Sequence, residues 1–110
     1  MIDYKKLSNK QIESINEVMD NFDFERVEKV MNCLEWSWGI GHNEHVPDIY
    51  EIKRFARQLL VDTIIGFSHL IDDKSLSLST GGFVATSYRD GSLSLSFVVE
   101  EWGYSIEEDI

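Results

Sequence analysis

Residues 79–83, with the sequence STGGF, place two adjacent glycines behind two hydroxyl groups. Such a segment can hold a phosphate when it leads directly into a helix whose N-terminus faces the anion. Here the flanking residues alternate apolar and hydroxyl side chains, which predicts strands on both sides, and no lysine follows the glycines. We therefore interpret Gly81 and Gly82 as a β-bulge, with a ligand cradle as the alternative.

His42 and His45 form an H-x-x-H pair in a glycine-containing loop. Such a pair binds zinc when two further ligands converge on it, and Cys33, Glu35 and Glu44 are the nearest candidates along the chain. The C-x8-H-x2-H spacing matches no standard zinc module, however. We expect no metal, and keep a small metal-assisted enzyme using His42 and His45 as an alternative.

The hydroxyl and carboxylate residues of the C-terminal half do not form a recognisable catalytic set. The serines lack a G-x-S-x-G elbow, and their alternation with leucine is typical of the solvent face of a half-buried strand. Glu100 and Glu101 are neighbours on a predicted strand, so their side chains would point to opposite faces. We therefore expect a protein that is not an enzyme and needs no cofactor.

Two aromatic segments are candidate binding surfaces. The sequence EEWGYSIEED at residues 100–109 sets a Trp and a Tyr among five carboxylates, and residues 36–45 contain two Trp in a loop. Aromatic anchors ringed by carboxylates fit a basic protein surface, whereas the alternative is a solvated tail with the Trp side chains packed on the core. The candidate partner-binding residues are Trp36, Trp38, Glu100, Glu101, Trp102, Tyr104, Glu107 and Glu108.

Three helices are predicted to come first in the chain. Ser8 and Gln11 form a capping box that starts a helix over residues 9–20, and Asp23 can cap a second helix over 24–36. Pro47 suits the first position of a third helix over 47–65, which should stop near Gly66. This third helix carries Lys53, Arg54 and Arg57, a basic cluster in an acidic chain.

After residue 73 the apolar period changes from 3.6 to 2, which predicts a β-hairpin over residues 75–102 and an acidic tail over 103–110. If Asp90 and Gly91 form a two-residue turn, Val84 shares a face with Leu95. If Arg89 joins a three-residue loop with Gly91 left-handed, Ala85 takes that place, and we favour this register. With a bulge at Gly81 and Gly82, one buried face then holds Leu76, Leu78, Phe83, Ala85, Leu93, Leu95, Phe97 and Val99.

These elements predict a single α+β domain with about three α-helices packed on one face of a C-terminal antiparallel β-hairpin or small sheet. The 43% hydrophobic content favours folding, and the formal charge of -10 would repel nucleic acid and anionic membranes but attract a basic protein surface. One cysteine and the lack of a long apolar run point to the cytoplasm.

Three stretches carry a family resemblance: FDFERVEKVMNCLEWSWG, VPDIYEIKRFARQLL and STGGFVATSYRDGSLSLSFVVEEW. They span roughly residues 22–102, and their W-x-W-G, STGGF and EEW elements resemble a family of small uncharacterised proteins encoded by phages and prophages. The resemblance implies a setting in the cytosol of a bacterial host. It implies no activity and no catalytic residue.

Together these observations predict a non-enzymatic acidic binding protein of phage or mobile-element type. Its partner would be a protein with a basic surface, such as a nucleic-acid-processing complex that the protein inhibits in the manner of an anti-CRISPR. We expect no direct binding to nucleic acid or membrane. The alternative is an antitoxin or immunity-type protein that neutralises a basic toxin. A homodimer is compatible with the serine-lined hairpin edge, which carries few charges to prevent pairing.

Overall fold

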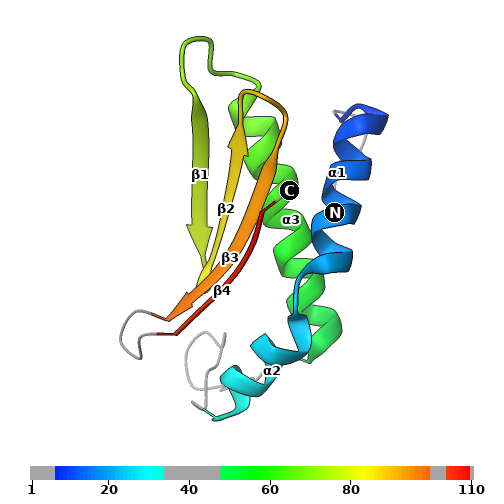
Figure 1. Ribbon diagram of the computed structural model, residues 1–110, viewed down its shortest axis with the longest axis vertical. Helices are drawn as coiled ribbons and strands as arrows, with labels where there is room; N and C mark the ends of the chain where they lie inside the picture. Colours follow the sequence, from blue (N-terminus) through cyan, green and yellow to red (C-terminus); the bar gives the residue numbers. More distant parts are fainter. Residues whose placement is uncertain (1–6, 34–47, 100–103, 110) are drawn as a thin grey trace.

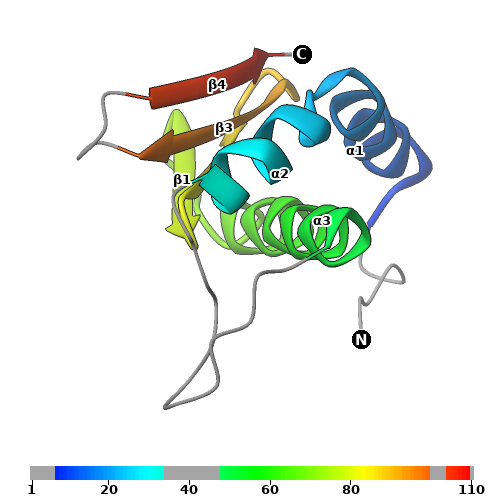
Figure 2. The same ribbon diagram turned by 90° about the horizontal axis from the view of Figure 1, so that it is seen from below.

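The computed structural model describes residues 7–33, 48–99 and 104–109. Helices α1 (Asn9–Asn21), α2 (Phe24–Cys33) and α3 (Ile49–Phe67) precede strands β1 (Ser75–Thr80), β2 (Phe83–Tyr88), β3 (Leu93–Val99) and β4 (Tyr104–Asp109). The strands form one antiparallel sheet in the order β1-β2-β3-β4, and the helices cover one of its faces (Figures 1 and 2). The predicted α+β class is confirmed.

The first two helices begin where their capping residues predict. The Ser8 N–H donates to Gln11 Oε1 at 2.8 Å, and the Gln11 N–H donates to Ser8 Oγ at 3.1 Å, so the capping box of α1 is complete. Asp23 Oδ1 accepts from the Arg26 N–H at 3.1 Å and caps the start of α2. Side-chain oxygens therefore satisfy N–H groups that have no partner within the helix.

Helix α3 begins later and ends later than the sequence predicts. Its N-cap is Asp48, whose Oδ1 accepts from the Glu51 N–H at 2.9 Å, so the start at Pro47 is wrong. An N-cap carboxylate satisfies an orphan N–H, which proline at the first helical position does not do. The helix also runs through Gly66 to Phe67, and a Cβ at Gly66 would lie 3.0 Å from Leu76 Cδ2. This glycine permits close approach of β1 instead of stopping the helix.

The glycine pair forms a turn and not the predicted bulge. Thr80 pairs with Phe83, and Gly81 and Gly82 between them have φ angles of 58° and 89°. Two central residues with positive φ make the tight hairpin turn that joins β1 to β2. A two-residue turn pairs even-numbered positions with odd-numbered ones, such as Leu78 with Ala85, which explains the phase change along the sequence. The glycines lead into β2, so the helix that a phosphate cradle requires is absent at this point.

The second turn has the favoured register. Ala85 pairs with Leu95 and Ser87 with Leu93, while Arg89, Asp90 and Gly91 form the loop. Gly91 has a φ of 92°, as the left-handed position requires. The Ser92 hydroxyl and N–H both donate to Asp90 Oδ1, and these hydrogen bonds hold the pKa of the Asp90 carboxyl below its ordinary value near 3.8.

The segment expected to be an acidic tail contains a fourth strand. Residues 104–109 form β4, which pairs with β3 from Val99 opposite Tyr104 to Ser94 opposite Asp109. The alternation that identifies a half-buried strand is obscured here by consecutive carboxylates. Acidic residues have a low intrinsic propensity for β structure, but pairing with β3 outweighs it here.

Helices and sheet meet at a cluster of aromatic rings around Phe83. The Phe83 ring centroid lies 5.1 Å from that of Phe97 and 6.1 to 6.3 Å from those of Phe22, Phe24 and Phe55. Two of these tilted rings belong to β2 and β3, and three belong to the helical part of the chain, so the cluster joins both layers of the fold. The apolar residues buried around them include Ile15, Val18, Val27, Ile52, Leu60 and Leu95. The predicted buried face of the sheet is confirmed for Phe83, Ala85, Leu93, Leu95 and Phe97, whereas Leu76 and Leu78 at the edge strand β1 are only half-buried.

Candidate interaction surface

The predicted binding residues divide into two groups. Trp36, Trp38, Glu100, Glu101 and Trp102 lie outside the described residues, as do His42 and His45. Tyr104, Glu107 and Glu108 lie on β4. Among the described residues, no group of three or more His, Cys, Asp or Glu side chains is arranged to hold a metal ion.

Strand β4 places consecutive acidic residues at one edge of the sheet. Glu107 pairs with Ser96, Glu108 with Leu95 and Asp109 with Ser94. Because β4 is the last strand in the sheet order, only one of its sides is hydrogen-bonded to another described strand. Residues 104–109, which were predicted to belong to a tail, therefore form an edge strand.

Helix α1 carries a second acidic feature, which the sequence analysis did not identify. Glu13, Glu17 and Asp20 are exposed and spaced four and three residues apart, so they follow one another along the helix. The other side of α1 carries Ile15 and Val18, which are fully buried, and this burial turns the three acidic residues outward. Within the described part of the chain, none of the three carboxylates has an ion-pair partner.

The two acidic segments lie side by side although they come from distant parts of the sequence. Helix α1 packs against β3 and β4, and β4 runs back along the sheet toward this helix, as both ribbon views show. We define the acidic edge as Glu13, Glu17 and Asp20 of α1 together with Glu107, Glu108 and Asp109 of β4. The spacing of acidic residues in α1 was visible in the sequence, but its proximity to β4 depends on the unpredicted strand.

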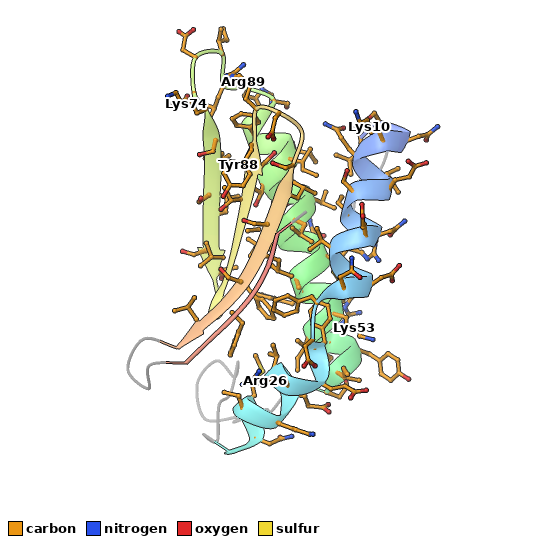
Figure 3. All side chains as sticks on the ribbon, viewed as in Figure 1. Lys10, Arg26, Lys53, Lys74, Tyr88 and Arg89 are labelled. Atoms are coloured by element: carbon orange, nitrogen blue, oxygen red, sulfur yellow. The ribbon has the colours of Figure 1, made fainter. Side chains whose placement is uncertain are left out.

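The basic cluster of α3 lies on the other side of α1. Lys53 and Arg54 are exposed, and the Arg57 Nη1 donates to Asn16 Oδ1 at 2.8 Å across the α1–α3 interface. An open hollow of about 440 Å³ separates this cluster from Met19 and Asp20 of α1. Cationic side chains therefore lie near the acidic residues of α1, with Lys53 on α3 and Lys10 on α1 itself (Figure 3).

The fold is α+β, and the acidic edge is part of its described surface. Comparison of the sequence with protein-family models found no matching family, and comparisons with curated proteins and with solved structures found no match either. None of the described helices combines the length and apolar character that crossing a membrane requires.

Proposed function

We propose that this protein is a non-enzymatic acidic binding protein whose acidic edge docks on a basic surface of another protein. The observation that carries the proposal is that α1, which exposes Glu13, Glu17 and Asp20, packs beside strand β4, which contains Glu107, Glu108 and Asp109. Carboxylates without internal ion-pair partners keep their charge available for a partner, and complementary charge speeds association and selects partners.

In its finer form, the proposal assigns the partner to the nucleic-acid-binding machinery of a bacterial host. A groove built for phosphates presents clustered Lys and Arg side chains, which exposed carboxylates can occupy in place of the nucleic acid. The protein would then act in the cytoplasm as an anti-defence inhibitor of the phage or mobile-element type. The formal charge of -10 supports a partner with a basic surface.

Affinity capture from a bacterial lysate tests the proposal when three forms of the tagged protein are compared. The edge variant carries Glu13→Gln, Glu17→Gln and Asp20→Asn. A matched control removes three exposed charges at the far end of α3 and beyond it, with Asp62→Asn, Asp72→Asn and Asp73→Asn. We expect the parent and the control to retain the same nucleic-acid-binding protein, and the edge variant to bind it about tenfold more weakly.

Two further readouts define the mechanism. Added salt should release the partner, because the contacts are between exposed charges, and duplex DNA should displace the protein because both compete for one groove. Equal retention of the partner by the edge variant and the control would rule out the acidic edge as the docking surface. A tight one-to-one complex with a single toxin that DNA does not displace would instead identify an antitoxin or immunity-type protein.

A further inference from the structure

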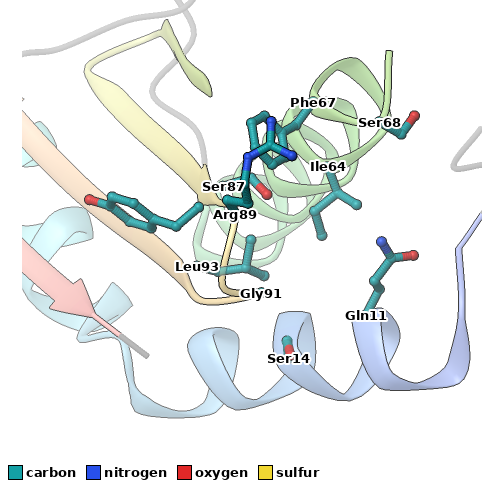
Figure 4. Close-up of a pocket in the computed structure, with 10 residues that line it drawn as sticks. Gln11, Ser14, Ile64, Phe67, Ser68, Ser87, Arg89, Gly91 and Leu93 are labelled. Carbon is teal, nitrogen blue, oxygen red and sulfur yellow. The ribbon is translucent and has the colours of Figure 1, made fainter. Parts of the chain in front are cut away.

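A small cleft lies between α1, the end of α3 and the turn that joins β2 to β3 (Figure 4). Its volume is about 180 Å³. Ile64, Phe67 and Leu93 supply apolar walls, and Gln11, Ser14 and Ser87 supply polar groups. The cleft involves none of the residues of the acidic edge, so an inference drawn from it goes beyond the proposed function.

Ser87 is an unusual residue for its position in the sheet. It lies on β2 in the same alternating row as Phe83 and Ala85, and it is only 6% exposed. Its hydroxyl makes no hydrogen bond to any described residue. The other buried hydroxyls are partnered, since Thr63 Oγ1 donates to the Leu59 carbonyl at 2.7 Å and Thr86 Oγ1 lies 2.7 Å from Ser77 Oγ. A buried hydroxyl without a partner costs free energy, so one that lines a cleft indicates a ligand.

Gln11 adds a second group with free hydrogen-bonding capacity. Its Oε1 accepts from the Ser8 N–H in the capping box, which fixes the orientation of the amide. The Nε2 is then available, and Figure 4 shows it turned toward Ile64 on the cleft side of α1. Within the described chain this nitrogen has no hydrogen-bond acceptor. The amide therefore offers two N–H donors to a molecule in the cleft.

Arg89 provides a fixed positive charge among the residues that line the cleft. Its Nε donates to the Asp73 carbonyl at 2.8 Å and its Nη2 to the Ile71 carbonyl at 2.7 Å, while its guanidinium carbon lies 5.5 Å from the centre of the Phe67 ring. The remaining nitrogen, Nη1, has no partner among the described residues. None of the residues lining the cleft is an Asp or Glu, although the chain contains 20 of them.

We propose that this cleft binds a small organic carboxylate. Three kinds of donor, the Ser87 hydroxyl, the Gln11 amide and the Arg89 guanidinium, match the acceptor oxygens of a carboxylate. The apolar walls match a short hydrocarbon body, and a cavity of roughly 150 Å³ is known to accommodate a benzene ring. A ring-sized carboxylate such as benzoate is therefore the simplest probe of the site.

The test is a titration of the isotope-labelled full chain with sodium benzoate, followed by two-dimensional amide NMR. We expect saturable shifts at amides of the cleft and weaker binding of benzamide, which keeps a carbonyl but carries no charge. Gln11→Glu preserves the capping box while replacing the free amide donors with a carboxylate, so it should abolish binding of benzoate. Asn9→Asp adds the same charge to the same helix away from the cleft and serves as the matched control.

Ser87→Ala separates a ligand contact from a structural role. Loss of one hydrogen bond to a charged group should weaken benzoate binding roughly tenfold, yet the melting temperature of the free protein should not fall, because the hydroxyl has no internal partner. Benzoate binding that is unchanged by both Ser87→Ala and Gln11→Glu would overturn the proposal. So would the absence of saturable shifts at the cleft, or benzamide binding as tightly as benzoate.

Discussion

Gly82 and Gly91 both have a positive φ, but a side chain at the two positions would meet different surroundings. A Cβ at Gly82 would lie 2.7 Å from Cε1 of Phe97, a ring that is fully buried in the aromatic cluster and cannot move aside easily. A Cβ at Gly91 would meet no heavy atom within 4 Å. Conformational strain therefore acts at both turns, whereas a steric conflict with the core acts only at the first.

We expect Gly82→Ala to lower the free energy of unfolding by roughly 2–5 kcal/mol, because the left-handed conformation and the overlap with Phe97 both contribute. Gly91→Ala should cost only about 1–2 kcal/mol, from its conformation alone. Urea denaturation followed by circular dichroism measures both values and gives each variant the other as a reference. Equal losses of stability would show that the Phe97 ring adapts to the new methyl group.

For single residues, the sequence predicts the backbone conformation of a turn better than it predicts a binding site. The left-handed Gly91 follows from the RDG turn and is confirmed. Ser87 appears in the sequence as one more serine of an alternating strand, and only the structure shows that it is buried in the row of Phe83 and Ala85. The available signal was a serine at an odd-numbered, helix-facing position of β2. It was hard to recognise because many other strand serines lie at solvent-facing positions.

Helix α3 is the element on which the two-layer arrangement depends. It packs across β1 and β2 and also against α1 and α2, so its position links every described helix to the sheet. Its start is fixed by the reciprocal hydrogen bonds of Asp48 and Glu51, at 2.9 and 3.4 Å. Fraying of this first turn would loosen Ile49 and Ile52, which lie at the end of the core.

Replacement of Asp48 tests this cap. We expect Asp48→Ala to reduce stability by about 1 kcal/mol, because the Glu51 N–H loses its acceptor. Asp48→Asn removes the same charge but keeps an acceptor oxygen, so it should be nearly neutral. Thermal unfolding followed by calorimetry separates the two variants. If both lose the same stability, the charge at the helix N-terminus matters more than the hydrogen bond.

The bounds of the helices could be predicted closely from the sequence, because caps and apolar spacing are local signals. Ser8 and Asp23 cap their helices, and Ile15 is buried. The sheet was harder to predict. A bulge and a two-residue turn at Gly81 and Gly82 both change the phase of the apolar pattern, so the pattern alone does not choose between them. Strand β4 depends on its pairing with β3, a tertiary contact that its run of carboxylates does not announce.

On the scale of the whole molecule, the dominant property is an excess of carboxylates. The chain contains 20 acidic residues but only 10 basic ones. On α1, the neighbouring residues Glu13, Glu17 and Asp20 have no ion-pair partner among the described residues. Repulsion among exposed charges of one sign opposes the compact state, and its strength falls as the ionic strength of the solution rises. The acidic edge therefore has a cost for the unbound protein.

Stability should accordingly increase with sodium chloride. We expect the melting temperature to rise by a few degrees between low and physiological ionic strength, since about 1 kcal/mol shifts the midpoint of a domain of this size by roughly 4 °C. The edge variant with Glu13→Gln, Glu17→Gln and Asp20→Asn should show a smaller rise. A melting temperature that falls with salt would mean that favourable ion pairs outweigh the repulsion.

The aromatic cluster also bears on how the chain is made. Phe22 and Phe24 leave the ribosome roughly sixty residues before Phe83, the ring against which they pack, and at typical rates of synthesis this interval lasts several seconds. The sheet, in contrast, joins only strands that are adjacent in sequence and can form locally as it emerges. During this interval α1 and α2 expose apolar stripes that only the later strands can cover. The nascent N-terminal half is thus the state of this protein that a chaperone would recognise.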